Sequence, residues 1–377
     1  MKQKVKDLFI ISLISIVPTL LLWFPFFFRF KSFWNIPLPT QGMATIVANF
    51  DGPLYIVTAK TLYNPSLIGT NFQFPLSNEY YSAHFPLYPL AIRLFSYILG
   101  YPYAMLFVSL VSSIAALYIF YLLLRNHTER NGALWLTFLF SIFPARWLIV
   151  RSVGSPEPLF IALIMASIYF FSKKKYLFAG IYGFFAQMTK SPAILLFVGY
   201  VIEIVLSNIH SLKRVDLKKY IPLILIPLGV LAVFSIYKLT YNDFFVYFKS
   251  GDNMHLFFPP FQIFNYSAPW VGTFWLEEVI FIYAIGALGV YKLYKEKMYN
   301  YFFFAITFFI PLLFVAHRDL LRYSIPLIPF LFLGFNKELQ NKEFKYLALL
   351  LIIPIYLYSL AFISQNAMPI SNWTPFL

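Results

Sequence analysis

One carboxylate in this sequence precedes a glycine and a proline in an otherwise apolar region. Asp51 lies in the run Asn49-Phe50-Asp51-Gly52-Pro53, and the apolar spacing after it fits an amphipathic helix at a membrane surface. An Asp at this point can be a simple N-cap that satisfies free backbone N–H groups. A carboxylate at a helix start that faces a pocket can also accept a proton as a general base. The sequence leaves both roles open.

Two further segments combine an ionisable group with a neighbouring proline. Glu157 lies between Pro156 and Pro158, which restrict its backbone. It can cap the next helix, or act as a second acid that orients a sugar or binds a cation. Lys190 precedes Ser191-Pro192 at a break between two apolar runs. A cation beside a helix start can bind phosphate, since free N–H groups point there too. The alternative is an anchor at the membrane interface.

The remaining candidates are basic or aromatic and suit the recognition of phosphate. In the run from His317 to Tyr323, Arg318 and Arg322 are four residues apart, on one face of a helix. Arginine forks match phosphate oxygens; the alternative is an anchor, or an internal ion pair with Asp319. Asp51 and Glu157 are thus catalytic candidates, and the candidates for substrate binding are His84, Arg93, Arg151, Lys190, His317, Arg318, Arg322 and Tyr323.

Other kinds of catalytic chemistry are not indicated. The chain has no Cys, which excludes a disulfide framework, a thiolate zinc site and a cysteine nucleophile. It also lacks a P-loop, an HExxH motif and a GxSxG motif. A substrate activated beforehand and carried by a lipid therefore fits better than a nucleotide.

The elements that position these residues are predicted to be membrane helices. The 377 residues are 60% hydrophobic and 12% charged, with a mean hydropathy of +0.72. These values exclude a soluble globular protein and a disordered one. Since a span needs roughly 20 apolar residues, we expect an all-α polytopic transmembrane bundle of about 11 spans. They lie near 8–28, 103–124, 133–150, 158–172, 176–189, 192–207, 220–241, 278–291, 299–316, 323–335 and 346–363.

The distribution of charge predicts the orientation. The formal net charge is +14, and most of the 29 basic residues fall in short loops on one side, among them Lys2, Lys4, Lys6, Lys213 and Arg214. Cytoplasmic loops carry such an excess. We therefore expect an integral protein of the plasma (inner) membrane with a cytoplasmic N-terminus. Topology accounts for the charge, so nucleic acid is not an expected partner.

Two long segments, residues 29–100 and 242–277, are expected on the non-cytoplasmic face. Long loops between spans usually carry function, and the site candidates gather on this face. We expect interfacial helices in the first loop, above a pocket, and a single transmembrane domain over residues 1–377. A transport path would instead place ionisable groups within the spans, where only Lys238 and Glu203 are candidates.

Several motifs, in this order, resemble the multi-spanning glycosyltransferases of the GT-C class, and most closely the PIG-V-like mannosyltransferases and their bacterial relatives. The run Phe50-Asp51-Gly-x-x-Tyr-Ile-x-x-Ala is similar to a Trp-Asp…Ile-Ala run in that family, with Phe50 in place of the usual Trp. His84-Phe-Pro-Leu-Tyr-Pro and the later Arg93 resemble its Phe-Phe-Pro-Leu-x-Pro…Arg stretch.

Three later motifs extend this resemblance over most of the chain. Ser-Pro-Glu157-Pro-Leu-Phe is similar to the family's Ser/Thr-Glu-Ser-Leu-Phe motif. Thr-Lys190-Ser-Pro resembles Thr-Arg-Ser-Asn-Gly, with Lys for Arg, and Arg322-Tyr323…Pro…Pro resembles a late Arg-Tyr…Pro…Pro segment.

The resemblance implies a hexosyltransferase that uses a polyprenyl- or dolichyl-phosphate sugar as donor, with a mannose-like hexose favoured. Asp51 would take the proton of an acceptor hydroxyl, on a lipid, a glycan or a protein, and a single displacement would invert the anomeric centre. Arg318, Arg322 and Lys190 would neutralise the departing lipid phosphate, while Glu157 and His84 would position sugar or acceptor. Some members of the class use a divalent cation, so such an ion is a possible cofactor.

Two other functions stay open at this point. A transporter or flippase of lipid-linked sugars is the first, and Lys238 and the break at Lys190 favour it. A non-catalytic membrane subunit with a GT-C-like fold is the second, and the departures at Phe50 and Lys190 favour it.

Overall fold

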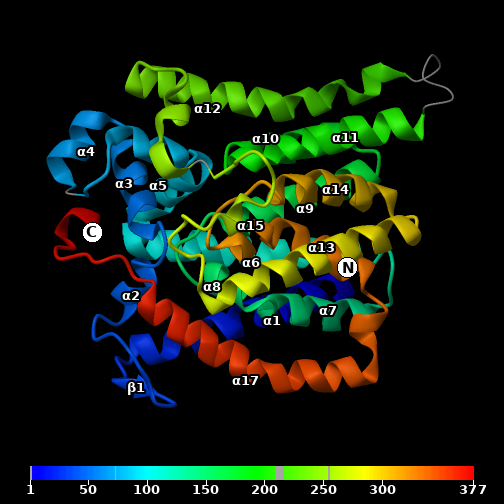
Figure 1. Cartoon of the computed structure of the whole chain (residues 1–377), viewed down its shortest axis with the longest axis horizontal. Coiled ribbons are helices and arrows are strands. Elements are labelled where there is room, and N and C mark those ends of the chain that lie inside the picture. The colour runs from blue at the N-terminus through cyan, green and yellow to red at the C-terminus, as the bar shows by residue number, and fades with distance from the viewer. Residues whose placement is uncertain (1, 73, 209–215, 254) are drawn as a thin grey trace.

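The computed structural model shows a mainly helical chain whose long helices lie side by side (Figure 1). The structure describes residues 2–72, 74–208, 216–253 and 255–377, so Lys213 and Arg214 lie outside the described residues. Within these ranges, strands β1 (Ser32–Phe33) and β2 (Ile36–Pro37) form a small antiparallel pair with Ser32 opposite Pro37. The predicted all-α fold is confirmed.

Each apolar segment that the sequence indicated as a span is helical. Its apolar side chains form a bundle core, with Phe120, Phe140 and Trp147 among the residues fully buried there. The bundle helices are α1 (Lys2–Phe27), α6 (Tyr101–Leu124), α7 (Arg130–Ile142), α8 (Ala145–Arg151), α9 (Glu157–Ser172), α10 (Tyr176–Gln187), α11 (Ile194–Ser207), η4 (Leu217–Ile224), α12 (Leu225–Tyr241), α13 (Glu278–Lys295), α14 (Tyr299–Leu312), α15 (Leu320–Ser324), η9 (Ile325–Leu327), α16 (Ile328–Gly334) and α17 (Lys342–Gln365).

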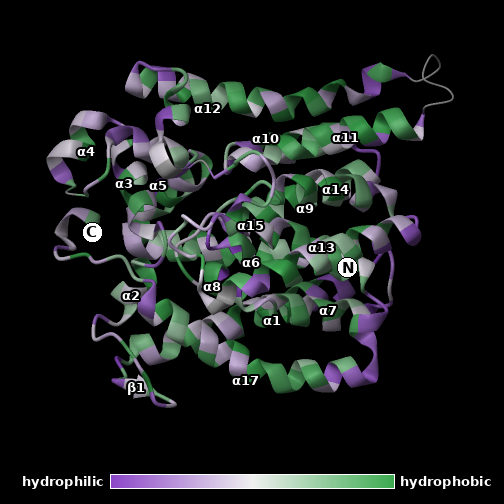
Figure 2. Ribbon diagram, in the orientation of Figure 1, coloured by the Kyte–Doolittle hydropathy of each residue, from purple (hydrophilic) through white to green (hydrophobic). Residues whose placement is uncertain are grey.

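The lengths of these helices differ more than the sequence suggested. Four of the described helices are long and apolar enough to cross a membrane alone, namely α1, α6, the continuous η4–α12 helix and α17. A fifth span is possible where α7 and α8 meet at a bend of 76°. Shorter apolar helices, such as α9, α11 and α14, pack between them. Hydrophobic residues follow the helices and hydrophilic ones gather at their ends (Figure 2), as expected of an integral membrane protein that crosses the bilayer several times.

The first long loop forms a layer of short helices at one end of the bundle, on the left of Figure 1. Local signals set their limits: the Asn64 side chain caps one helix, and Gly100, at a φ of 72°, separates α5 from α6. Helix α5 buries Tyr88 and Ile92 but exposes Tyr97 and Ile98, which fits a helix at an interface. The helices are α2 (Met43–Val47), α3 (Gly52–Thr61), α4 (Pro65–Asn71), η1 (Asn78–Ala83) and α5 (Leu87–Leu99).

The second long loop packs onto the same end. Leu256 pairs with Val315 in an isolated bridge, which ties this loop to the segment before α15. The short helical turns of this loop are η5 (Val246–Lys249), η6 (Gly251–Asn253), η7 (Gln262–Phe264) and η8 (Phe274–Glu277). Similar turns elsewhere in the chain are η2 (Ser191–Ala193), η10 (Glu338–Gln340) and η11 (Thr374–Phe376).

Close helix packing generates a prediction about stability. A Cβ atom at Gly180 would lie 2.1 Å from the backbone oxygen of Pro222, where α10 crosses η4. We expect Gly180→Ala to destabilise the protein by about 1–3 kcal/mol, because the backbone must move apart. Gly69, in α4, has nothing within 4 Å of its Cβ position, so Gly69→Ala is the matched control. Thermal unfolding in detergent measures both, and equal midpoints would contradict the packing argument.

Candidate active site

A cavity of about 150 Å³ lies at the end of the bundle that carries the two long loops. Its walls come from segments far apart in the sequence, since the first loop, α9, the α10–α11 turn, the second loop and α15 all contribute. The residues that line it include Asp51, Tyr55, His84, Glu157, Lys190, Tyr247, Asn253, Arg322 and Tyr323. The structure thus brings together six of the residues predicted from sequence.

Glu157 is the common partner of the two cations in this cavity. Its Oε1 atom accepts hydrogen bonds from Lys190 Nζ and from Arg322 Nε, each at 2.8 Å. Its Oε2 atom accepts a bond from the Ser155 hydroxyl. The Glu157 side chain is only 3% exposed. A buried carboxylate with both oxygens engaged is suited to holding its partners in place, and less to exchanging protons.

Asp51 has a different environment, because its carboxylate is only partly engaged. Asp51 Oδ2 lies 3.5 Å from Arg322 Nη2, and the side chain is 38% exposed. Asp51 occupies the N-cap position of α3, but its side chain makes no capping hydrogen bond. The simple N-cap role is therefore not what the geometry shows. The carboxylate instead lines the cavity beside a guanidinium, where it can meet a ligand.

The turn that presents Asp51 is held from several sides. Phe50 has a φ of 48°, in the left-handed region that is strained for a residue with a large side chain. The buried Asn49 amide donates to the Ile363 carbonyl and accepts from the Asn366 amide, beyond α17. Asn49 also forms a bridge with Ala367. These contacts fix the backbone on the N-terminal side of Asp51.

Two glycines bring the Asp51 turn close to the loop that carries Glu157. A Cβ atom on Gly52 would lie 2.4 Å from the Val47 carbonyl oxygen, so no side chain fits there. A Cβ atom on Gly154 would lie 2.2 Å from Cε of Met105. Met105 also lies beside Gly52, so this one side chain of α6 packs against both loops.

Arg322 links the two carboxylates of the cavity and rests on an aromatic ring. Its guanidinium carbon lies 4.4 Å from the centre of the Phe50 ring, within the range of a cation–π interaction. The face of the Phe50 ring is what this contact requires. Phe50 therefore supports Arg322 from below.

His84 lines the cavity as a buried imidazole. It is 3% exposed, and its ring meets the Tyr55 ring edge to face at 4.8 Å. Its Nδ1 atom has no hydrogen-bond partner among the described residues. Burial lowers the pKa of His84, although the nearby Asp51 carboxylate raises it. The ring is therefore neutral at ordinary pH and can offer a hydrogen bond to a ligand.

His317 and Tyr323 form an aromatic group beside the cavity. The His317 ring lies 4.4 Å from the His255 ring and 5.2 Å from the Tyr323 ring. Its Nδ1 atom accepts the backbone N–H of Asp319 at 3.0 Å. Burial is the main cause that lowers the pKa of His317 to about 4, and the nearby His255 and Arg322 contribute to the same shift.

Three predicted binding residues lie away from the cavity. Arg93 donates to the carbonyls of Ala59 and Lys60 at 3.0 Å, so it caps the end of α3. Arg151 is fully buried and donates to the carbonyls of Ser141 and Ser15, which ties α8 to α7 and α1. Arg318 is exposed. For Arg93 and Arg151 the geometry gives a structural role in place of the predicted contact with substrate.

Sequence reasoning missed some of the residues that line the cavity. Tyr55 lies one helical turn after Asp51, and the i,i+4 spacing is a signal that could have found it. Tyr247 and Asn253 come from the second long loop, and Tyr247 donates to Ser191 Oγ at 3.0 Å beside Lys190. No local pattern distinguishes these two from other polar residues of the loop.

The possible divalent cation finds no donor set here. The parts of the chain that the structure describes contain no group of three or more His, Cys, Asp or Glu that could hold a metal ion. Arg322 contacts both Asp51 and Glu157, so the two carboxylates share a guanidinium. The site as formed suits an anionic or neutral ligand.

Lys238 and Glu203, the two ionisable residues expected within spans, are placed differently from one another. Lys238 is exposed near the end of α12 and donates to the carbonyl and side-chain oxygens of Asn242, both at 3.0 Å. Glu203 is buried in α11, and its Oε2 atom has no partner among the described residues. Lys238 therefore does not line a path through the bundle.

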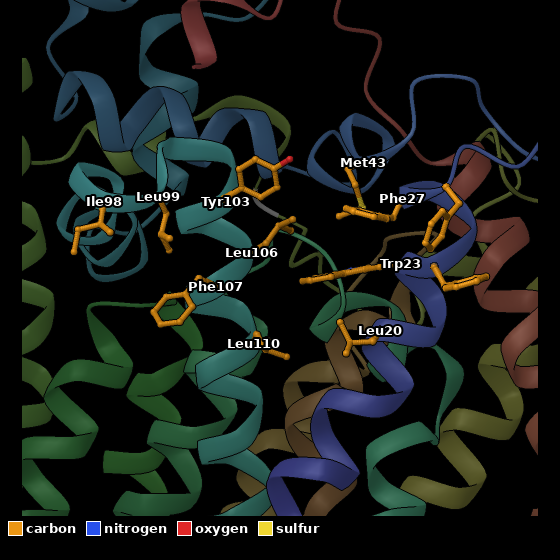
Figure 3. Close-up of a pocket in the computed structure, with 12 residues that line it drawn as sticks. Leu20, Trp23, Phe27, Met43, Ile98, Leu99, Tyr103, Leu106, Phe107 and Leu110 are labelled. Carbon is orange, nitrogen blue, oxygen red and sulfur yellow. The ribbon is translucent and has the colours of Figure 1, made fainter.

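A larger hollow of about 750 Å³ lies between α1 and α6 and is apolar (Figure 3). Trp23 and Leu20 of α1 face Leu106 and Leu110 of α6 across it. It includes none of the predicted site residues. Its lining is mostly apolar, apart from polar atoms such as the Tyr103 hydroxyl, and mostly apolar surface suits a lipid chain.

Comparisons with known proteins identify the fold. No family model matches the chain, and no curated protein matches it. Among solved structures, the chain is similar to ArnT from Cupriavidus metallidurans bound to undecaprenyl phosphate, with a TM-score of 0.60, 12% identity, and coverage of 89% of this chain and 61% of that one. Its similarity to the apo state of ArnT has a TM-score of 0.51, 14% identity, and coverage of 90% and 61%.

The described architecture is that of a multi-spanning helical membrane protein whose fold is similar to that of ArnT. The chain spans about three fifths of the length of ArnT.

The shared Glu157 carboxylate leads to a prediction about stability. Glu157→Gln would leave Lys190 and Arg322 without their common counter-charge, and breaking a buried ion pair costs roughly 3–5 kcal/mol. We expect the lower end of that range, since Lys190 is 29% exposed. The control Glu296→Gln removes an exposed pair with Lys337, which should cost under about 1 kcal/mol. Comparable shifts of the unfolding midpoint in both variants would refute the central role of Glu157.

A second prediction concerns pH. The pKa of His317 is about 4 in the folded protein, against 6.5 ordinarily. Between these values the unfolded chain binds a proton that the folded protein does not, so this contribution to stability is lost as pH falls from about 6.5 to 4. In His317→Asn, whose amide oxygen can accept the Asp319 N–H, we expect a smaller loss. Thermal unfolding at about pH 7 and pH 5 compares the two; an equal loss would contradict the prediction.

Proposed function

We propose that this protein transfers a sugar from a polyprenyl-phosphate donor to an acceptor hydroxyl at the non-cytoplasmic face of the plasma (inner) membrane. The observation that carries the proposal is the charge arrangement of the cavity. Asp51 presents a partly free carboxylate beside Arg322, while Glu157 holds Arg322 and Lys190 together at 2.8 Å each. A proton acceptor thus lies next to two cations, as sugar transfer from a lipid phosphate requires.

The donor phosphate is proposed to lie against Lys190 and Arg322. The Lys190 ammonium has three N–H donors and is 29% exposed, so it can reach a ligand while it keeps Glu157. As the bond between the anomeric carbon and the phosphate oxygen breaks, its electron pair passes to the phosphate. Fixed cations stabilise that growing negative charge more than they stabilise the intact donor, which lowers the barrier.

Asp51 is proposed to act on the acceptor. The acceptor oxygen forms a bond to the anomeric carbon from the side opposite the leaving phosphate, and its proton passes to Asp51. One displacement of this kind inverts the anomeric configuration. Arg322, 3.5 Å away, is proposed to hold the carboxylate in its orientation toward the cavity. His84 and Tyr323, which line the same cavity, are proposed to contact the sugar or the acceptor.

Two independent likenesses support this function. The fold is similar to that of ArnT, which was solved with undecaprenyl phosphate. The ordered motifs at Asp51, Glu157, Lys190 and Arg322 resemble PIG-V-like mannosyltransferases, which makes a mannose-like hexose the proposed sugar. The apolar groove between α1 and α6 offers a place for a lipid chain at the membrane. A lipid, a glycan or a protein can supply the acceptor hydroxyl.

The experiment that tests the proposal is transfer of labelled sugar from a panel of polyprenyl-phosphate sugars in proteoliposomes that include a crude membrane extract. Removal of a general base typically costs 10²–10⁴-fold, so we expect Asp51→Asn to lower turnover by roughly that factor with little change in unfolding midpoint. The control Glu277→Gln alters an exposed carboxylate on the same face and should transfer sugar at the wild-type rate.

Each contrary outcome points to another function. Equal turnover in Asp51→Asn and the wild type would remove Asp51 as the base. Labelled lipid that changes leaflet without release of polyprenyl phosphate would favour a transporter. If the wild type neither consumes a donor nor moves one across the bilayer, the result would favour a non-catalytic membrane subunit.

A further inference from the structure

Beside the cavity, two arginines and two phenylalanines form a continuous stack, which we call the Arg–Phe ladder (Arg322, Phe50, Phe362 and Arg146). Arg322 lies over the Phe50 ring at 4.4 Å, and Arg146 lies over the Phe362 ring at 3.8 Å. The two rings are neighbours, with centres 5.6 Å apart. The members come from α15, the turn before α3, α17 and α8. The ladder therefore joins four separate elements at the site.

Asp319 connects the two ends of the Arg–Phe ladder. Its Oδ1 atom lies 3.0 Å from Arg146 Nε. Asp319 also precedes α15, and its carbonyl accepts the backbone N–H of Arg322 at 3.0 Å. The position of Arg322 is thus determined twice, by the ring beneath its guanidinium and by the start of the helix that carries it. Arg146 contacts both supports, because it lies over the Phe362 ring next to Phe50 and pairs with Asp319 at the start of α15.

Arg146 depends strongly on this one counter-charge. Its side chain is 11% exposed, and that of Asp319 is 14% exposed. The Nε and Nη1 atoms of Arg146 make no hydrogen bond to any described residue, because the contact with Asp319 is close but poorly aligned. A nearly buried guanidinium without hydrogen bonds keeps its place through the Asp319 charge and the Phe362 ring. Loss of either partner should shift the whole stack.

We propose that Arg146 and Asp319 are positioning residues for sugar transfer, which hold Arg322 at its working distance from Asp51 and Glu157. Neither residue lines the cavity, so neither is assigned contact with donor or acceptor. They act through Arg322, whose role at the lipid phosphate rests on the function proposed above. A displaced Arg322 stabilises the developing charge less, so kcat should fall more than the KM for donor rises.

A mutant cycle tests this inference. The variants are Arg146→Met, which keeps length and loses charge, Asp319→Asn and the two combined, each made in the wild type and in an Arg322→Ala background. Sugar transfer gives kcat and KM, and thermal unfolding is measured for every variant. Lys337→Met, which removes an exposed ion pair with Glu296, is the control and should retain wild-type kcat.

If Arg146 and Asp319 act through Arg322, each single variant lowers kcat at least tenfold, and the combined variant loses little more than either one. In the Arg322→Ala background the same changes then have no further effect on kcat. Losses that multiply in that background would show a general structural role and overturn the inference.

The outcome can be separated from that of the proposed function. If the wild type transfers no sugar, the proposed function fails, and unfolding midpoints still report the coupling. The ladder then predicts that Arg146→Met lowers the midpoint less in Arg322→Ala than in the wild type. Equal shifts in the two backgrounds would overturn the inference whatever the activity.

Discussion

The site depends on one buried carboxylate that two cations share. Glu157 begins α9, while Lys190 lies in the α10–α11 turn and Arg322 in α15, yet both cations reach the same oxygen atom at 2.8 Å. In a membrane protein an uncompensated buried charge is very costly. The three elements therefore have little freedom to separate. The cavity that they line is held rigid by the same contacts. The positions of Asp51, Phe50 and His84 are set relative to this fixed centre.

The charges of this centre also define what can enter it. Two carboxylates and two cations balance, and the neighbouring His84 is held neutral by burial. A ligand that brings a single negative charge next to Lys190 and Arg322 meets cations whose remaining N–H groups are available. A divalent cation would be repelled by the Arg322 guanidinium, which already contacts both carboxylates. This arrangement of charges is the physical reason for which a lipid phosphate is proposed as the ligand of the cavity.

Sequence reasoning gave the fold class well because long apolar segments and one-sided basic residues are strong signals. It also selected Asp51, Glu157, Lys190 and Arg322, which line one cavity, because charged groups in an apolar context are costly without a role. It could not distinguish these residues from Arg93 and Arg151. A charged residue that binds backbone carbonyls and one that lines a cavity occur in the same kind of local sequence. It also missed Tyr247 and the Arg146–Asp319 contact, which arise only where distant segments meet.

The turn before Asp51 has a consequence for the order in which the molecule is made. Its backbone is held by the amide of Asn49, whose partners are Ile363 and Asn366. More than three hundred residues of chain separate these partners, and a ribosome delivers the turn long before them. The Asp51 turn therefore reaches its final backbone contacts only after α17 has been synthesised and has packed against it.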